Sequence, residues 1–526
     1  MTALAGRRRT GLLIPLSSAP STASWGIGDI GDVAPLSGWL AGAGCRVLQV
    51  LPLNEMAPGQ QSPYSALSAM AIDPLFIRLA DVEEVRASGG EAAMACVARQ
   101  MLECVRRSPR VDYAAVRTLK HDALIHAFMR FYDAEWSRDS QRARTFREFV
   151  TRQAWWIEDY ALFRAIHARE DERPWTEWPE ALRRRDPPAI DRTRRDLARE
   201  VVFYQYLQWL AASQWREARR TAAANGVAIF GDLPFMVDCD SADVWARQHQ
   251  FRLDVSLGVP PDAFSATGQD WGMPVYRWDV IAADDFRWLR DRARRAADLY
   301  DGFRVDHLVG FYRTFGRPRD GGEGLFTPED ETDQIALGER VLAIFREPGA
   351  EIIAEDLGTV PDYVRESLRR VGIPGYRVFR WERRWHRDGQ PFRDPVDYPA
   401  ASVATTGTHD TEPMATWWDR ADEDERRLVA EIPSVQRVIA DIARRPFDAD
   451  VRDGLLETLF ASGSDLLLFP VQDVFGWRDR INEPAKVDDR NWTFQLPWPS
   501  DRLIEEPEAA ERQHVLRLLS EKYGRV

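Results

Sequence analysis

The sequence predicts an α/β fold, a (β/α)8 TIM barrel that carries a large helical insertion. Short apolar runs recur along the chain and end in polar or glycine-containing loops. Such runs are typical of parallel strands that are buried on both faces. Patterns with helical spacing lie between most of them. Eight strands that alternate with helices match a barrel, and a doubly wound open sheet is the alternative architecture.

The predicted strands extend over most of the chain. Most of the runs are almost wholly apolar, but the fourth, DGFRVDHL, contains arginine and aspartate at alternate positions. Alternate side chains of a strand share a face, so these two groups should lie side by side. The eight runs cover residues 11–18, 45–53, 227–235, 301–308, 351–358, 376–381, 401–410 and 464–473.

The helical pattern is clear in PDYVRESLRRVG at 361–372. Its apolar residues Tyr363, Val364 and Leu368 have helical spacing, and Gly372 is a stop signal. We therefore expect a helix between the fifth and sixth strands.

One connection is too long for a barrel loop. Residues 54–226 separate the second and third strands, and most of them have helical patterns. We interpret residues 76–225 as a mainly helical insertion subdomain, with residues 1–75 and 226–526 forming the two parts of the barrel. The expected helices of the insertion lie within 91–107, 122–136, 146–170 and 201–226.

The composition limits the environment and the partners. A net charge of −13 argues against a nucleic-acid partner, which would require a basic surface. No segment approaches the length of a membrane span, and the apolar run after Arg9 is too short for a secretory signal. Four cysteines without a CxxC pair favour neither a disulfide framework nor a zinc site. We expect a cytoplasmic protein, either a monomer or a small homo-oligomer.

Ionisable residues collect where the predicted strands end, and in a barrel those ends form the face that carries function. Taken singly, each group has a structural interpretation, such as an ion pair or a helix cap. Together they are harder to explain structurally, because clustered carboxylates repel one another. The residues are Asp232, Arg304, Asp306, His307, Glu355, Asp356, His409 and Asp410.

Carboxylates without other catalytic signatures narrow the chemistry. The chain has no GxSxG, GxxxxGK[ST] or strand-associated GxGxxG motif. Glycosyl transfer remains, in which one carboxylate attacks the anomeric carbon and another protonates the leaving oxygen. Arg304 would keep Asp306 ionised as the nucleophile. Crowding against Asp306 and Asp410 would raise the pKa of Glu355, as a general acid requires.

Six sequence blocks resemble those of one enzyme family. RVDH at 304–307, AEDLG at 354–358 and GTHD at 407–410 resemble the catalytic blocks of the 4-α-glucanotransferases, glycoside hydrolase family 77. More particular to that family are the blocks at 62–77, 231–245 and 258–278. The resemblance covers nearly the whole chain.

The resemblance implies a role for each site residue. Asp306 is the nucleophile, Glu355 the acid/base and Asp410 the residue that holds sugar hydroxyls, with Arg304, His409 and His307 in support. Residues 258–278 form an extended loop that covers the active-site cleft. The implied substrate-binding residues are Ser62, Tyr64 and Asp232 on the donor side, Asp262, Phe264, Gln269 and Trp271 in the covering loop, and Asn482 and Pro484 after the eighth strand.

The chain departs from the family pattern at several positions. Ala263 stands where an aromatic residue is usual, Ala266 where an acidic residue often lies, and Met273 where asparagine is common. Ala485 and Lys486 replace the Gly-Thr that usually follows the NxP segment. These departures bear on substrate preference and not on the chemistry.

The expected function is 4-α-glucanotransfer without a cofactor or metal ion. A segment of an α-1,4-glucan would pass, with retention of configuration, to the 4-OH of glucose or another glucan. The implied partners are α-1,4-glucans, maltooligosaccharides and glucose. Two alternatives are an α-1,4-glucan hydrolase, in which water accepts the glycosyl unit, and a non-catalytic glucan-binding protein. The second would be expected to lack at least one of Asp306, Glu355 and Asp410.

Overall fold

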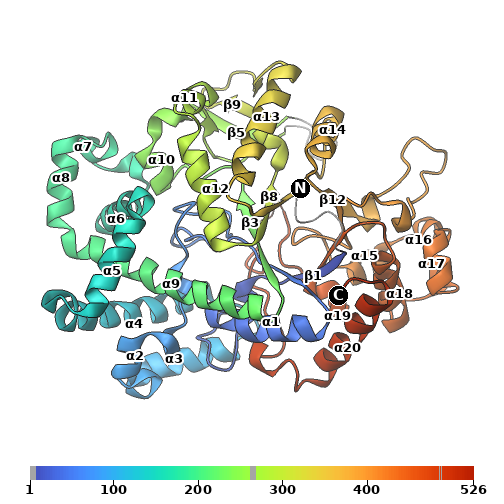
Figure 1. Cartoon of the computed structure of the whole chain (residues 1–526), viewed down its shortest axis with the longest axis horizontal. Coiled ribbons are helices and arrows are strands. Elements are labelled where there is room, and N and C mark those ends of the chain that lie inside the picture. The colour runs from blue at the N-terminus through green and yellow to red at the C-terminus, as the bar shows by residue number, and fades with distance from the viewer. Residues whose placement is uncertain (1–7, 261–267, 485, 487) are drawn as a thin grey trace.

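A computed structural model describes residues 8–260, 268–484, 486 and 488–526 and contains a closed barrel of parallel strands (Figure 1). Each barrel strand pairs with its neighbours along the chain, and the first strand closes the barrel against the last. The predicted (β/α)8 barrel is therefore confirmed, and the open sheet was the wrong alternative. The barrel strands are β1 (Arg9–Leu13), β2 (Val47–Gln49), β3 (Ala228–Pro234), β8 (Gly302–Asp306), β11 (Glu351–Ala354), β12 (Gly375–Val378), β13 (Ser402–Thr405) and β14 (Leu466–Pro470).

The strands are shorter than the apolar runs that predicted them. The run at 45–53 contributes only Val47–Gln49, although Leu51 and Leu53 are also buried. An apolar run indicates that a segment is buried, not that it is a strand. Here the chain stays buried beyond the end of β2. The run at 401–410 likewise ends its strand at Thr405.

The barrel interior is filled by side chains from alternate strand positions. Gly302 leaves room for the ring of Phe230 on the adjacent strand, since a Cβ at this glycine would lie 2.7 Å from the ring. The interior is thus a packed core and not a pore. Its buried apolar residues are Val47, Phe230, Ile353, Tyr376, Val403, Leu466 and Leu468.

Helices surround the barrel, as Figure 1 shows. The helix predicted at 361–372 is α14 (Asp362–Val371), and Gly372 follows it in the left-handed conformation with φ 73°. The other helices outside the insertion are α1 (Val33–Gly42), α10 (Ala242–Ala246), α11 (Trp278–Ala283), α12 (Arg287–Leu299), α13 (Glu331–Arg346), α15 (Met414–Arg420), α16 (Glu423–Ala430), α17 (Pro433–Val438), α18 (Ala449–Phe460), α19 (Val471–Phe475) and α20 (Pro507–Lys522).

The long segment between β2 and β3 is mainly helical and lies to one side of the barrel in Figure 1. The run at 146–170, which suggested one helix, is divided at Gln153 into two. The exact bounds 76–225 of a separate subdomain stay a prediction. The helices are α2 (Glu83–Ala87), α3 (Cys96–Arg107), α4 (Tyr113–Ala134), α5 (Gln141–Arg152), α6 (Ala154–Arg169), α7 (Glu180–Arg183), α8 (Pro187–Asp196) and α9 (Ala198–Ala224).

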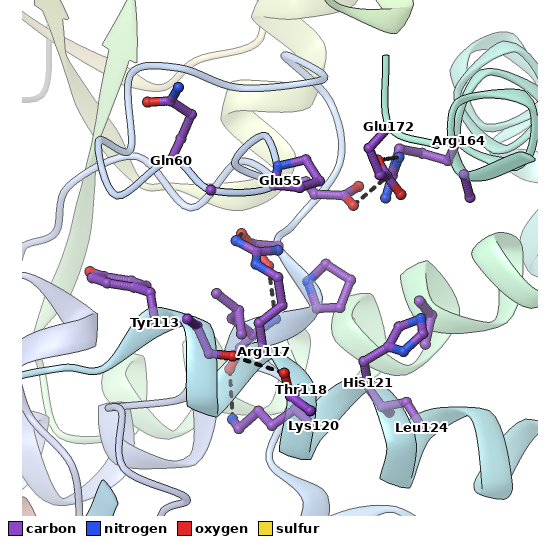
Figure 2. A pocket seen from close by; sticks show the side chains of 18 of the residues that line it. Glu55, Gln60, Tyr113, Arg117, Thr118, Lys120, His121, Leu124, Arg164 and Glu172 are labelled. Atoms are coloured by element: carbon purple, nitrogen blue, oxygen red, sulfur yellow. Dashed lines mark hydrogen bonds and ion pairs between the residues drawn. The ribbon is translucent and has the colours of Figure 1, made fainter. Parts of the chain in front are cut away.

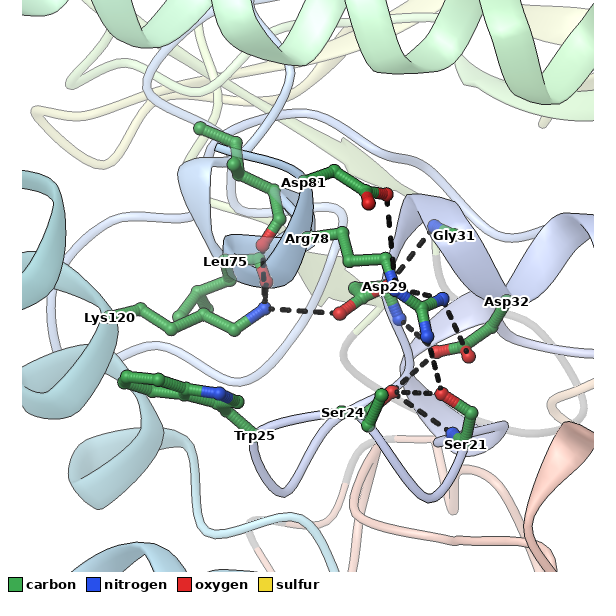
Figure 3. A network of polar contacts seen from close by, with 12 residues as sticks. Ser21, Ser24, Trp25, Asp29, Gly31, Asp32, Leu75, Arg78, Asp81 and Lys120 are labelled. Carbon is green, nitrogen blue, oxygen red and sulfur yellow. Dashed lines mark hydrogen bonds and ion pairs between the residues drawn. The ribbon is translucent and has the colours of Figure 1, made fainter. Parts of the chain in front are cut away.

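A buried polar network attaches α4 to the barrel (Figure 3). The Lys120 ammonium donates to two main-chain carbonyls of segment 75–77 at 2.6 and 3.0 Å and lies 3.8 Å from Asp29. Arg78 lies 3.7 Å from Asp29 and 3.5 Å from Asp32. Two cations and two carboxylates therefore balance one another where little water reaches.

A small antiparallel sheet stands beside the barrel strands. It has the order β10-β9-β5-β6, and β4 pairs separately with β7. Among the described residues, no helix is long and apolar enough to cross a membrane. The strands are β4 (Phe251–Arg252), β5 (Val255–Val259), β6 (Gln269–Asp270), β7 (Val275–Tyr276), β9 (Thr314–Pro318) and β10 (Leu325–Thr327).

Candidate active site

Strand β8 separates apolar from ionisable side chains by simple alternation. Phe303 and Val305 are fully buried in the main hydrophobic core, on the outer face of the strand. Arg304 and Asp306 share the other face, and Arg304 Nη2 donates to Asp306 Oδ1 at 2.7 Å. The strand thus delivers a charge-assisted pair to the carboxyl end of the barrel.

Strand β3 adds a second carboxylate to the same arginine. Asp232 is paired with Arg304 in the register of β3 and β8. Arg304 Nη1 donates to both oxygens of Asp232, at 2.7 and 2.8 Å. Asp232 does not end its strand as predicted, because the pairing continues to Pro234. It therefore lies one side-chain layer deeper than Asp306.

Glu355 directly follows β11 and lies beside β8. Its main-chain N–H donates to Val305 O at 3.1 Å. Its carboxyl oxygens accept from the N–H groups of His307 (2.9 Å) and Leu357 (3.0 Å). Desolvation raises the pKa of Glu355 to about 7, helped by the charge of Asp306 and opposed by Arg304. The raised pKa was predicted, but burial is a larger cause than the neighbouring carboxylate.

His409 and Asp410 approach from the loop beyond β13. His409 Nε2 lies 3.3 Å from Asp410 Oδ2, and Asn482 Nδ2 donates to Asp410 Oδ1 at 2.6 Å. Although burial opposes ionisation, the His409 charge and these hydrogen bonds hold the pKa of Asp410 well below its usual range. Asp410 is therefore a carboxylate that stays charged at neutral pH.

Tyr64 connects the two halves of this cluster. Its hydroxyl donates to Asp232 Oδ2 at 2.8 Å and lies 3.0 Å from His409 Nε2. The rings of Tyr64 and His409 are stacked, with their centroids 5.5 Å apart. Ser62 plays a local part in the structure, since its Oγ accepts from the Tyr64 N–H at 3.3 Å.

Part of the covering loop reaches the cluster. The Trp271 ring meets His307 edge-on, with centroids 4.8 Å apart. Trp271 Nε1 also donates to the exposed Gln269 at 3.1 Å. Desolvation lowers the pKa of His307 to about 4, so this ring is neutral at pH 7. The predicted residues Asp262 and Phe264, and the departures Ala263, Ala266 and Ala485, lie outside the described residues.

The segment after β14 supplies residues that the sequence did not identify. Asn482 contacts Asp410, whereas Pro484 is exposed, and the substrate-binding role of both stays a prediction. Arg480 Nη2 donates to the main-chain oxygen of Asp410 at 2.6 Å. Trp492, with φ 66°, packs against both Tyr64 and His409. Neither Arg480 nor Trp492 belongs to a recognisable motif, and only the fold brings them to the site.

A separate cavity of about 580 Å³ lies between the loop that precedes Ser62 and helix α4 (Figure 2). Arg117, Glu55 and Arg164 line this cavity. Arg164 Nε donates to Glu55 Oε1 at 2.9 Å. Tyr113, in its wall, donates to the main-chain oxygen of Trp492 at 2.9 Å. Asp232, Asp306, Glu355 and Asp410 do not line this cavity, so it is distinct from the cluster described above.

Comparison with known proteins gives a consistent result. A family model described as 4-alpha-glucanotransferase matches residues 14–500. The chain is 34% identical over 530 residues to the 4-alpha-glucanotransferase of Thermus thermophilus, covering 96% of this chain and 99% of the relative. It is 31% identical over 499 residues to that of Chlamydia pneumoniae, covering 92% and 91%.

A solved structure agrees with these sequence matches. The amylomaltase from Streptococcus agalactiae, in complex with acarbose, superposes with a TM-score of 0.82 at 25% identity. The match covers 99% of this chain and 100% of that chain. The barrel, the insertion and the segments around the site therefore all fall within the matched region.

Proposed function

The chain belongs to the 4-alpha-glucanotransferase family, glycoside hydrolase family 77, and from that premise we propose which of its residues carry the transfer. The enzyme is a 4-alpha-glucanotransferase. The observation that supports our assignment is the contrast between two neighbouring carboxyl groups. Asp306 receives a hydrogen bond from a guanidinium, while the pKa of Glu355 is raised to about 7.

In the first step, an oxygen of Asp306 attacks the anomeric carbon of the donor glucan. The bond between that carbon and the glycosidic oxygen breaks, and Glu355 gives its proton to the departing oxygen. The glycosyl unit is then bound covalently to Asp306 with inverted configuration. Arg304 orients the attacking carboxylate through its bond at 2.7 Å.

In the second step, Glu355 acts as a base. It removes the proton from the 4-OH of an acceptor, and the acceptor oxygen attacks the anomeric carbon while the bond to Asp306 breaks. Two inversions restore the α configuration. A carboxyl group with a pKa of about 7 suits both directions of proton transfer.

The remaining polar groups hold the sugar. Asp410 stays charged beside His409, so it can accept hydrogen bonds from sugar hydroxyls and stabilise positive charge as the oxocarbenium ion develops. Ser62, Tyr64 and Asp232 form the donor side in this proposal. Asn482 fixes the carboxylate of Asp410 at 2.6 Å.

The covering loop favours a sugar over water as acceptor. Trp271 presents an aromatic ring beside His307, and such a surface packs on sugar C–H groups and displaces water. The proposed substrates are α-1,4-glucans, maltooligosaccharides and glucose. Four unpaired cysteines support a reducing, cytoplasmic location.

Product analysis with maltotriose tests this proposal. The wild-type enzyme should convert pure maltotriose into glucose and a ladder of longer glucans, and the Asp306→Asn variant should form neither. Formation of only glucose and maltose would identify a hydrolase instead. Turnover by Asp306→Asn at the wild-type rate would remove the nucleophile from our assignment.

A further inference from the structure

A continuous path of hydrogen bonds runs across the site from His409 to Asp306. His409 Nε2 lies 3.0 Å from the Tyr64 hydroxyl, which donates to Asp232 Oδ2 at 2.8 Å. Arg304 then binds Asp232 through Nη1 and Asp306 through Nη2, each at 2.7 Å. The path joins residues from four barrel strands or the loops that follow them.

The direction of each bond follows from what each group can do. An ionised Asp232 that is bound to a guanidinium can only accept, so the Tyr64 proton points to Asp232. The Tyr64 oxygen is then an acceptor for its other neighbour. His409 must therefore carry a proton on Nε2, which also faces Asp410 at 3.3 Å.

Asp232 is well placed to control the direction of the guanidinium. Arg304 is 4% exposed, and its buried Nε has no hydrogen-bond partner among the residues that the structure describes. Its orientation therefore depends on the contacts of Nη1 and Nη2. Because Nη1 is bound by Asp232 and the guanidinium is planar, the position of that carboxylate helps to set the direction of Nη2 toward Asp306.

We propose that Tyr64 is a positioning residue for the nucleophile. Its hydroxyl holds Asp232, which orients Arg304 and so aims Asp306, and it ties this unit to the sugar-holding pair His409 and Asp410. The inference rests on the proposed role of Asp306 and extends it. Binding of a sugar at Asp410 is thereby linked to the orientation of the attacking carboxylate.

The Tyr64→Phe variant isolates the hydroxyl. Its ring should still stack on His409 and pack against Trp492, since both contacts involve only the ring. Tyr206→Phe is a matched control in the insertion. Tyr206 also donates to a carboxylate, Glu84 (2.9 Å), which is bound in turn by Arg142 (2.6 Å).

The primary measurement is steady-state disproportionation of maltotriose. For Tyr64→Phe we expect kcat to fall by about tenfold to a hundredfold, the loss of one buried hydrogen bond acting on the transition state, with KM changed less than about threefold. Tyr206→Phe should keep the wild-type kcat. An unchanged kcat for Tyr64→Phe, or an equal loss in both variants, would overturn the proposal.

A double-mutant cycle tests whether Tyr64 acts through Asp232. In an Asp232→Asn background, Tyr64→Phe should reduce kcat by less than about twofold, because the two changes interrupt one path. A full loss in that background would show that Tyr64 acts independently and would contradict the relay.

Imidazole ¹⁵N NMR provides a readout that needs no activity. The His409 signal, assigned with a His409→Asn variant, should show a protonated Nε2 in the wild-type protein and a shifted Nε2 resonance in Tyr64→Phe. An unprotonated Nε2 would overturn the proposal. Failure of this proposal can be distinguished from failure of the proposed function. Only an error in the proposed function, in which Asp306 is the nucleophile, would leave the Asp306→Asn variant active.

Discussion

Asp306 and Glu355 lie beside each other at the ends of adjacent strands, but their surroundings differ. Asp306 accepts a charge-assisted hydrogen bond from a guanidinium, which fixes the orientation of the carboxylate as a nucleophile. Glu355 accepts from two main-chain N–H groups and is desolvated, and the desolvation raises its pKa to about 7. Two carboxyl groups thus acquire different roles from their environments.

The acid role of Glu355 predicts how a Glu355→Gln variant responds to the leaving group. Formation of the glycosyl-enzyme from maltotriose should slow by about a hundredfold or more, whereas reaction with α-maltosyl fluoride, whose leaving group needs no proton, should slow far less. Wild-type activity should decline as the pH rises through about 7, where Glu355 loses its proton. The variant should lack this decline.

Rapid-mixing measurements of glucose and fluoride release, over pH 5 to 9, check both expectations. Equal losses with the two donors would remove the acid role from Glu355. An alkaline decline that persists in Glu355→Gln would assign the titration to another group.

The same pKa predicts a change in stability. The folded pKa of Glu355 is raised above its unfolded value, so the unfolded chain releases this proton at lower pH and stability falls as the pH rises toward 7. Glu355→Gln removes the free-energy cost of ionising this buried carboxyl group in the folded protein. Its melting temperature should exceed that of the wild type at pH 8 by more than at pH 5, as measured by differential scanning calorimetry. An identical difference at both pH values would contradict the raised pKa.

At the scale of elements, strand alternation made part of the site predictable. The spacing of Arg304 and Asp306 placed them on one face, and their predicted contact is confirmed at 2.7 Å. The depth of Asp232 was not predictable, because apolar content does not reveal where the β3 ladder ends. Trp492 reaches the site through a loop with a left-handed backbone, which no periodicity in the sequence signals.

Within the covering loop, Trp271 is expected to control the fate of the glycosyl intermediate. Trp271→Ala should raise the ratio of hydrolysis to transfer, because removing the ring admits water beside His307. Product ratios with excess maltotriose, at constant overall turnover, measure this effect. Trp385→Ala, which removes a tryptophan that is 56% exposed, is a suitable control. The loop has no such role if both variants keep the wild-type ratio.

Helix α4 depends on Lys120 for its attachment to the barrel. Lys120→Met should lower the free energy of unfolding by about 3–5 kcal/mol, since it leaves the carbonyls of segment 75–77 without their donor and Asp29 with Arg78 as its remaining cation. Urea denaturation of this variant and of the exposed control Lys522→Met measures the difference. Equal midpoints for the two variants would show that the network contributes no net stability.

For the whole molecule, the order of the barrel strands was predictable because every barrel strand overlaps a distinct apolar run. The break between α5 and α6 at Gln153 was harder to predict from the sequence, because the apolar pattern continues through it and only the backbone conformation changes. The raised pKa of Glu355 was predicted from charge alone. Its main cause, burial, requires the closed barrel and is not contained in any local segment.

Trapping of the covalent intermediate tests the central claim most directly. The Glu355→Gln variant, mixed with α-maltosyl fluoride, should accumulate a maltosyl-enzyme because the second step lacks its base. Peptide mass spectrometry should locate the maltosyl group on Asp306, and the Asp306→Asn, Glu355→Gln double variant should remain unlabelled. A maltosyl group on any other residue, or fluoride release without labelling, would contradict Asp306 as the nucleophile.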